Sequence, residues 1–386
     1  MPFTVDLDET AALLGALVSI KSINPAYPGA TSGEDRIGAF VLDYLQNLGL
    51  DCGAHEVLDN RFNVLGLLPG SSRRGLCLET HLDTMPVVNM EGEPFQPFLR
   101  DGRLYGRGSC DAKGSLAAML LALKLLVEQG NTPPTDIYLA AVVDEEYKYR
   151  GVTHLLESGF RVAGVVVGEP TNLAVVTACK GVVRWKIQTH GRAGHSSRPE
   201  EGHNAIYDMA AIIQGVKQKI IPKYKEQSHH LLGSPTVNIG CVSGGTVVNI
   251  IPDACTIELD RRMLPGETWE VIRGEFEALF KDLGVAGEIH EPYLIDEAME
   301  TAPGEPIVLA AQAACRKVLG SSRVQGVSFG CDATKFHRAG IPGIILGPGS
   351  ILQAHSIEEY VELEEVARAA EVYARLCATF NGGSEN

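Results

Sequence analysis

The stretch IYLAAVVDEE at residues 137–146 joins a run of apolar residues to three consecutive acids, Asp144, Glu145 and Glu146. Short continuous apolar runs are typical of strands buried on both faces of a parallel sheet. Further runs of this kind lie at residues 63–68, 76–80, 162–168 and 343–347, and helical periodicity appears between them at 33–50, 114–130, 304–320 and 362–380. This alternation predicts an α/β domain with a mostly parallel sheet, formed by residues 1–178 and 294–386.

The middle of the chain, residues 179–293, has a different order of elements. The pattern predicts strand, helix, two strands, helix and strand, at residues 182–190, 202–221, 234–244, 253–264, 266–284 and 285–293. A β-α-β-β-α-β order is that of the ferredoxin-like arrangement. We therefore expect a small α+β domain inserted into the α/β domain.

Length and charge exclude several classes of protein. A chain of 386 residues exceeds what one core usually supports, and its net charge of −15 argues against a nucleic-acid partner. No apolar run reaches the roughly 20 residues of a membrane helix, and the acidic start of the chain is unlike a secretory signal. The nine scattered cysteines favour reduced thiols. We therefore expect a cytoplasmic protein.

Metal-ligating side chains follow the predicted strands or begin a predicted helix. These residues are His81, Asp83, Asp111, Glu145, Glu146, Glu169 and His355. In open α/β sheets, sites are built at the carboxyl ends of the strands, so we expect these side chains to converge there. Two imidazoles with at least three carboxylates suit a pair of divalent metal ions, most simply zinc, with cobalt or manganese as alternatives.

The adjacent acids at 144–146 also indicate bound cations. Clustered carboxylates cost several kcal/mol when no positive charge compensates them, and two dications would compensate them here. Only one of Glu145 and Glu146 needs to be a ligand, which leaves the other free to hold an attacking water.

Seven motifs together resemble one family. They are HLDT (81–84), GRGSCDAKG (106–114), DEE (144–146), GEPT (168–171), GRAGHSSRP (191–199), VVNIIPDACTIELDRRMLPGE (247–267) and AHSIEEY (354–360). In this order they resemble the M20 metallopeptidases, a group that includes acetylornithine deacetylase, succinyl-diaminopimelate desuccinylase, aminoacylase-1 and carboxypeptidase G-type enzymes. The resemblance covers nearly the whole chain.

This resemblance implies roles for the residues of the larger domain. His81 and Glu169 would bind one metal, Glu146 and His355 the other, and Asp111 would bridge the two. Asp83 would orient the His81 ring. Glu145 would act as general base toward the attacking water and later protonate the leaving nitrogen.

The resemblance also implies that the inserted domain is a lid and a dimerisation domain, which makes the protein a homodimer. His195 would donate to the oxyanion, often across a dimer interface. Arg262 would bind a substrate carboxylate, with Arg261 as its rival, since strand alternation turns only one of them toward the site. Asn249 would line that pocket. The loop 326–336, which contains Gly330, would contact the substrate.

The function implied is that of a di-metal amidohydrolase that removes an N-acyl group from a small amino acid bearing a free carboxylate. Acetylornithine deacetylase and succinyl-diaminopimelate desuccinylase are the most similar members, whereas carboxypeptidase, dipeptidase and aminoacylase activities stay open. The expected partner is therefore an N-acyl amino acid or short peptide, with no nucleic acid and no membrane.

Other interpretations compete with this one. GVSFG at 326–330 matches the G-x-S-x-G motif of serine hydrolases, with Ser328 as nucleophile, but the preceding SSRVQ is a poor strand and the acids stay unexplained. A non-catalytic relative would be expected to lack a ligand or the base, and here all are present. Arg262 has a structural alternative, a pair with Asp260 or Glu258, and His195 has one as a turn residue.

Overall fold

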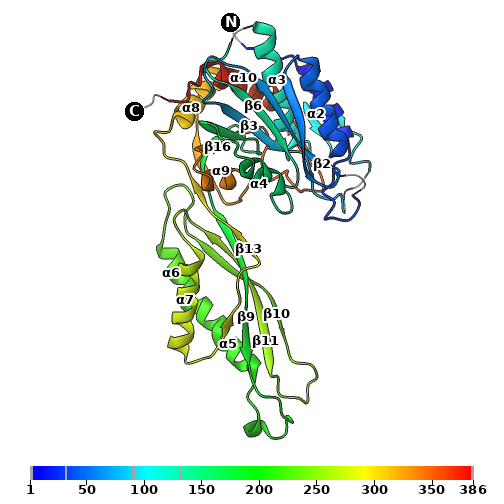
Figure 1. Ribbon diagram of the computed structural model, residues 1–386. Coiled ribbons are helices and arrows are strands. Elements are labelled where there is room, and N and C mark those ends of the chain that lie inside the picture. The colour runs from blue at the N-terminus through cyan, green and yellow to red at the C-terminus, as the bar shows by residue number, and fades with distance from the viewer. Residues whose placement is uncertain (1–2, 31–32, 89, 91, 131, 384–386) are drawn as a thin grey trace. The chain divides into compact units, whose positions relative to one another are not determined.

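The computed structural model describes residues 3–30, 33–88, 90, 92–130 and 132–383 (Figure 1). The chain divides into two compact units. One comprises Met1–Thr177, Thr301–Gln325 and Cys331–Asn386, and the other comprises Ala178–Glu300 and Gly326–Gly330. The sequence assigned 294–300 to the larger domain, but strand β13 (Leu294–Asp296) pairs with β9 (Gly181–His190), and this pairing keeps the segment in the second unit.

The sheet of the first unit runs in the order β1-β2-β6-β3-β7-β16-β8. Its strands are β1 (Asp51–Leu58), β2 (Arg61–Leu68), β3 (Leu76–His81), β6 (Ile137–Val142), β7 (Gly164–Val167), β8 (Val175–Cys179) and β16 (Gly343–Ile345). The four central strands, β6, β3, β7 and β16, are parallel. The outer pairs are antiparallel. The mixed α/β fold with a mostly parallel centre is thus confirmed.

Helices cover both faces of this sheet. One layer contains α1 (Leu7–Ser19), α2 (Asp35–Asn47), α3 (Lys113–Gln129), α8 (Pro306–Leu319) and α10 (Leu363–Thr379), and the other contains α4 (Arg150–Glu157) and α9 (Ala333–Arg338). The helices expected at 33–50, 114–130, 304–320 and 362–380 are therefore confirmed. The α2 helix ends just before Gly49, which adopts a positive φ of 75° that an L side chain rarely adopts.

The first unit also contains a small sheet formed by β4 (Phe98–Arg100), β5 (Arg103–Tyr105) and β17 (Tyr360–Glu362). Two further short strands, β14 (Met299–Glu300) and β15 (Val324–Val327), lie where the chain passes from one unit to the other. Along the 76–81 segment every residue of β3 is buried. This is why its apolar run was recognisable, whereas the exposed edge strand β1 lacks such a signal.

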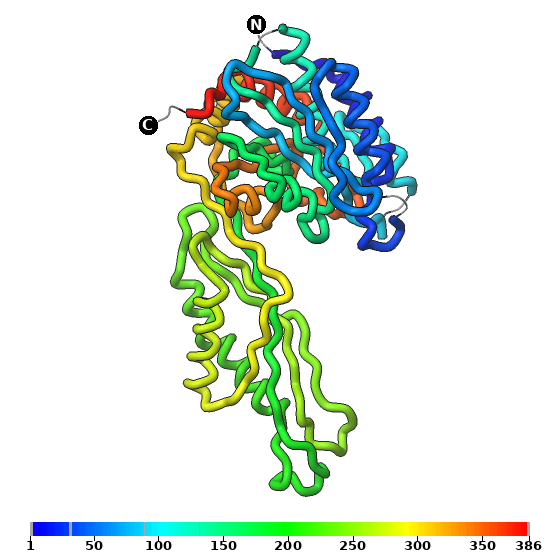
Figure 2. Tube along the Cα trace, in the orientation of Figure 1, coloured from blue at the N-terminus to red at the C-terminus, as the bar shows by residue number. Residues whose placement is uncertain are grey.

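The second unit has the predicted β-α-β-β-α-β order, which can be followed along the chain in Figure 2. Besides β9 it contains α5 (Ala205–Gly215), the π-helical turn Val216–Ile220, α6 (Ile221–Glu226), β10 (Thr236–Gly244), β11 (Ala254–Met263), α7 (Trp269–Leu283) and β12 (Glu288–Ile289). A 3₁₀ turn spans Pro199–Glu201. The strands are antiparallel in the order β10-β11-β9-β12. Trp185, Ile257 and Phe276 lie in its separate hydrophobic core.

Among the described residues, every helix is too short or too polar to cross a membrane.

Candidate metal centre

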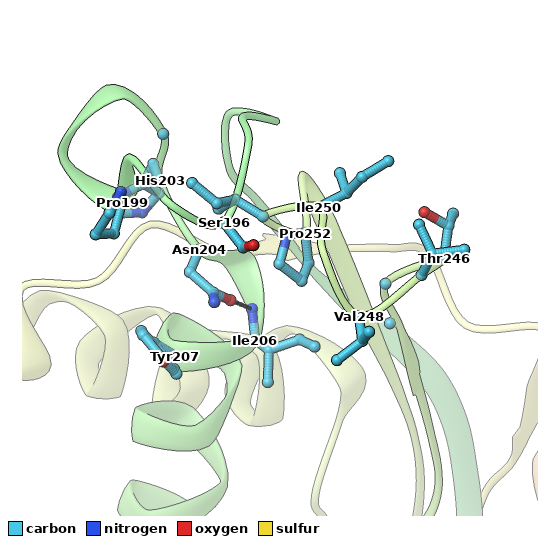
Figure 3. A pocket seen from close by; sticks show the side chains of 15 residues that line it. Ser196, Pro199, His203, Asn204, Ile206, Tyr207, Thr246, Val248, Ile250 and Pro252 are labelled. Carbon is cyan, nitrogen blue, oxygen red and sulfur yellow. Dashed lines mark hydrogen bonds between the residues drawn. The ribbon is translucent and has the colours of Figure 1, made fainter.

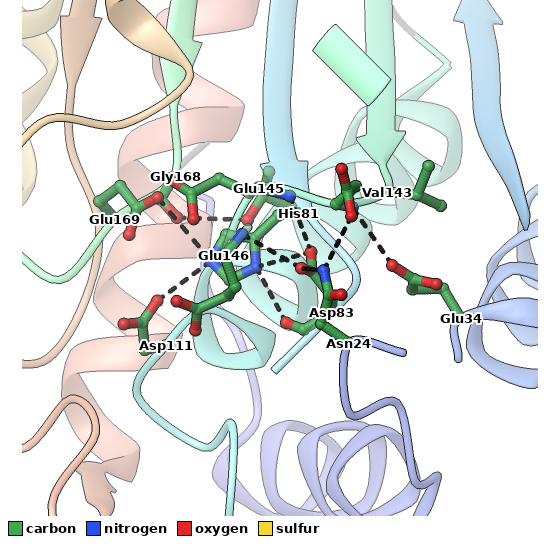
Figure 4. A network of polar contacts seen from close by, with 12 residues as sticks. Asn24, Glu34, His81, Asp83, Asp111, Val143, Glu145, Glu146, Gly168 and Glu169 are labelled. Atoms are coloured by element: carbon green, nitrogen blue, oxygen red, sulfur yellow. Dashed lines mark hydrogen bonds and ion pairs between the residues drawn. The ribbon is translucent and has the colours of Figure 1, made fainter. Parts of the chain in front are cut away.

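The candidate metal ligands lie at one edge of the central sheet, where Figure 4 shows His81, Asp111, Glu146 and Glu169. His81 is the last residue of β3, and Glu169 follows the end of β7 by two residues. Glu146 comes four residues after the last residue of β6, while Asp111 lies two residues before α3. His355 lies in the connection from β16 to β17. Because β6, β3 and β7 are parallel neighbours, their carboxyl ends bring these side chains together.

The Asp111 carboxylate lies between two imidazoles. Its Oδ1 is 3.0 Å from Nε2 of His81, and its Oδ2 is 3.2 Å from Nε2 of His355. Glu169 Oε1 is 3.8 Å from the His81 nitrogen, and each Glu146 oxygen is 3.1 Å from the His355 nitrogen. Two groups of donors result, and Asp111 belongs to both of them.

Each group has the chemistry and spacing of a metal site. The groups are His81, Asp111 and Glu169, and Asp111, Glu146 and His355; within each, the donor atoms lie within 4.8 Å of one another. Imidazole nitrogen together with carboxylate oxygen is a donor set that zinc and similar divalent ions accept. The structure thus brings together all five ligands expected from the sequence, and their donor atoms fit a pair of cations.

The tautomer of His81 suits a metal ligand. Its Nδ1 is 2.9 Å from the main-chain oxygen of Asp83, an acceptor, so Nδ1 carries a proton, and a neutral ring would present the lone pair of Nε2 to a metal. The Asp83 carboxylate is 3.6 Å from Nδ1. It instead accepts the backbone N–H groups of Glu145 and Glu146, each at 3.1 Å. Asp83 therefore contacts the ring mainly through its backbone, and its side chain holds the two glutamates.

The charges of the site are strongly coupled. Burial raises the pKa of Glu145 and Glu169 well above their usual range, and neighbouring carboxylates raise both further. Burial alone would lower the pKa of His355, but hydrogen bonds to Asp111 and Glu146 outweigh it and raise that pKa to about 10. The pKa of His81 is raised well above its usual value by Asp111 and Asp83, also against the effect of burial. Without cations, the cluster therefore retains protons at neutral pH.

A second pair of acids, missed by the sequence analysis, lies close to the same cluster. Glu79 on β3 and Asp332, which directly precedes α9, are buried carboxyl groups that interact electrostatically with each other and with His81. Burial raises both pKa values, that of Glu79 strongly and that of Asp332 to about 6. The signal was present in the sequence, because an acid in a wholly buried strand two residues before His81 points to the same face.

The remaining expected residues belong to the second unit. His195 is exposed, and its Nδ1 accepts the N–H of Ser197 at 3.2 Å, so Nε2 carries the proton and can donate. Asn249 is exposed, and its main-chain oxygen accepts from Ser196. A side chain on Gly330 would meet a carboxylate oxygen of Asp296 at 2.8 Å. The hydrogen bond that His195 accepts from Ser197 in this turn is therefore compatible with a donor role for its Nε2–H.

The two neighbouring arginines have different environments. Arg261 is buried and pairs with Glu267 at 2.5 Å, and its Nε donates to Tyr224. Arg262 lies on the other face of β11, with one third of its side chain exposed, and Nε donates to Asp260 at 3.0 Å. Arg261 is therefore committed to the core of the second unit. The pairing of Arg262 with Asp260 leaves part of its guanidinium accessible.

A third histidine group does not have the chemistry of a metal site. His229, His230 and Glu300 also bring donor atoms within 4.8 Å. However, His229 Nδ1 accepts the N–H groups of Leu231 and Leu232 at 3.2 and 3.3 Å, so Nε2 carries the proton and donates to Glu300. A metal on that nitrogen would need the opposite tautomer.

The structure gives no support to the serine hydrolase hypothesis. The expectation of a poor strand before Ser328 is wrong, since β15 forms at Val324–Val327, but helix α9 begins only at Ala333. A nucleophile elbow passes directly from strand to helix.

Comparisons with known proteins agree with this geometry. A sequence profile of the peptidase family M20/M25/M40 matches residues 77–379. Acetylornithine deacetylase of Myxococcus xanthus is 32% identical over 322 residues, which cover 81% of this chain and 82% of that protein. The aminopeptidase PepT of Bacillus cereus has a similar fold, with a TM-score of 0.83, 22% identity and coverage of 97% of this chain and 98% of that one. A dinuclear metal-binding peptidase of Bacillus subtilis matches with a TM-score of 0.72 and 16% identity, over 96% and 97% of the two chains.

The fold and the donor set are those of a metal-dependent hydrolase. The chain belongs to the M20 peptidase family, as the profile and the deacetylase relative both show, and it is a hydrolase of amide or peptide bonds.

Metal uptake by the purified protein should release protons at pH 7. The pKa of His355 is raised to about 10 and that of His81 is raised as well, so both imidazoles are protonated in the metal-free protein, and ligation requires them neutral. Affinity should therefore increase as the pH rises toward 10. Calorimetric titration with zinc in buffers of different ionisation enthalpy measures the release. Zinc binding with no proton release would contradict the protonated state of His81 and His355 in the metal-free protein.

Proposed function

We propose that the protein is a dinuclear metal-dependent N-deacylase that acts on small N-acyl amino acids with a free carboxylate. Its 32% identity to an acetylornithine deacetylase supports this substrate class. The observation that carries the proposal is the Asp111 carboxylate, which offers one oxygen toward each of two histidine-containing donor groups. A single carboxylate shared in this way is what a pair of closely spaced cations needs.

The ligands divide into two sets. We assign His81 and Glu169 to one ion, Glu146 and His355 to the other, and Asp111 to both. Zinc is the proposed metal, with cobalt or manganese as alternatives, because the donors are imidazole nitrogens and carboxylate oxygens. Bound there, the two ions would lower the pKa of a water and polarise the amide carbonyl.

The protein's own groups then move protons and hold the substrate. Glu145 removes a proton from the attacking water and delivers it to the leaving nitrogen, a role that suits a carboxyl whose pKa burial has raised. His195 donates its Nε2–H to the developing oxyanion. Arg262 binds the substrate carboxylate with its accessible guanidinium, and Asn249 and Gly330 contact the substrate nearby.

We also propose that the protein is a homodimer that pairs through its second unit. That unit carries an open pocket of about 680 Å³, and Ser196, the neighbour of His195, is one of the residues that line it (Figure 3). Tyr207, Val248 and Ile250 line this pocket and are exposed. Exposed apolar side chains gathered in this way are typical of an interface. Sedimentation of the purified protein tests the dimer.

The adjacent glutamates should respond differently to the same substitution. Glu145→Gln should retain both metals but lower kcat by about 10²- to 10⁴-fold, since it removes only the general base. Glu146→Gln should weaken the binding of one metal, because the amide is a poorer ligand. Metal content after dialysis and kcat distinguish the two variants. Near-normal turnover by Glu145→Gln would exclude it as the base.

A substrate panel tests the deacylase assignment. N-acetyl and N-succinyl amino acids should be hydrolysed faster than dipeptides and tripeptides, in the presence of zinc, cobalt or manganese. Arg262→Ala should raise KM for substrates with a free carboxylate while leaving their carboxamide analogues unchanged. If peptides are cleaved fastest, the protein is a peptidase of the family. If Arg262→Ala raises KM equally for the carboxylate substrates and their carboxamide analogues, Arg262 does not bind the carboxylate.

A further inference from the structure

The turn that carries the two site glutamates has an unusual backbone. Asp144 directly precedes Glu145 and Glu146, and its φ of 72° lies in the left-handed region that favours glycine. A side chain in this conformation persists only where its surroundings hold it. The directions of both glutamates therefore depend on whatever fixes Asp144.

The buried Asp144 carboxylate is held by three donors. Arg150 donates to it through Nε at 2.5 Å and through a terminal nitrogen at 2.9 Å. Arg61 donates at 3.0 Å and Asn24 also at 3.0 Å. Glu34 completes this arrangement, because it forms two hydrogen bonds with Arg61, at 2.6 and 2.5 Å, and accepts the backbone N–H of Asp144 at 3.2 Å.

Asn24 connects this network to the metal centre. Its amide nitrogen is 3.0 Å from Asp144 Oδ1 and 2.7 Å from Asp83 Oδ2, so each of its two N–H groups serves one carboxylate. Asp83 in turn accepts the backbone N–H groups of Glu145 and Glu146. Figure 4 shows Asn24 and Asp83 close together, with Glu34 farther from the two glutamates.

The charges of the network explain why residue 24 carries a neutral amide. Glu34, Asp83 and Asp144 carry three negative charges, and Arg61 and Arg150 carry two positive ones. Both arginines contact Asp144 and neither is paired with Asp83. A neutral double donor between Asp83 and Asp144 satisfies both carboxylates without adding a charge. An aspartate at position 24 would place a third carboxylate against them.

We infer that Asn24 and the Glu34–Arg61–Asp144–Arg150 network position the two glutamates for catalysis and metal binding. Asn24 is a positioning residue, since it acts on the reaction through Asp83 and Asp144 and not by touching the reacting atoms. The inference rests on the proposed roles of Glu145 as base and Glu146 as ligand. A misplacement of about 1 Å at such groups costs on the order of 10²-fold in rate.

Thr135 provides a control for Asn24. It is also a buried polar residue of the first unit, and it donates to the Ser72 oxygen at 3.1 Å and accepts the Gly75 N–H at 2.8 Å. Both of its partners are backbone groups that precede β3, at the end of that strand away from His81, so Thr135→Ala removes a buried polar group without freeing a carboxylate. Both alanine variants should lower the midpoint of chemical unfolding.

Only Asn24→Ala should affect the site. We expect its kcat to fall by about 10- to 100-fold at an almost unchanged KM. With cobalt bound, its visible absorption spectrum should differ from that of the wild type, while Thr135→Ala retains the wild-type kcat and spectrum. Equal losses of kcat in the two variants would overturn the inference, as would a wild-type kcat and cobalt spectrum in Asn24→Ala.

Arg150 provides a second variant that does not threaten folding, because 38% of its side chain is exposed. Arg150→Gln should lower kcat and alter the cobalt spectrum, and Arg150→Lys should restore part of both by returning the charge. A wild-type kcat in Arg150→Gln would contradict the network's role. If the wild type hydrolyses no N-acyl amino acid or peptide, the proposed function fails, whereas the cobalt spectra of the variants still test the positioning.

Discussion

The carboxylate of Asp111, set between the imidazoles of His81 and His355, is the interaction on which the rest of the site depends. Several further acids lie within the same small buried region, and like charges in such a region disfavour one another's ionised form. Protons relieve this repulsion in the metal-free protein, as the raised pKa values of Glu145 and Glu169 show. A pair of cations would relieve it while leaving the carboxylates ionised. The negative charge of the acids that follow β6 is therefore best understood as the counterpart of bound metal cations.

The fold supplies this arrangement through its parallel centre. Strands β6, β3 and β7 are neighbours that all run in one direction, so residues separated by many positions in the sequence meet at their carboxyl ends. The site also needs precise backbone positions beyond the strands. Asp83 holds the N–H groups of Glu145 and Glu146, and the ion network around Asp144 holds the left-handed turn before them. Ligand placement thus depends on a second set of charged groups, which acts through the backbone of this turn.

Much of this could be predicted from the sequence, for identifiable reasons. The apolar runs that became β3, β6 and β7 are buried on both faces and lack the alternation of an exposed strand, so they and the ligands after them were recognisable. The edge strand β1, with its mixed and largely exposed side chains, gave no such signal. The partners of Asp144 were not predictable, because Asn24, Glu34 and Arg61 lie 83 to 120 residues away in sequence and only the folded chain brings them together. Strand alternation left Arg261 and Arg262 open as alternatives, and the buried Arg261–Glu267 pair distinguishes them.

The central claim is that two cations share Asp111, and anomalous diffraction from crystals grown with zinc tests it most directly. The account predicts two zinc peaks, one within about 2.0–2.2 Å of donor atoms from His81 and Glu169, the other equally close to Glu146 and His355, with one Asp111 oxygen bound to each. A single peak, two peaks that do not share Asp111, or zinc bound only at His229 and His230 would contradict it.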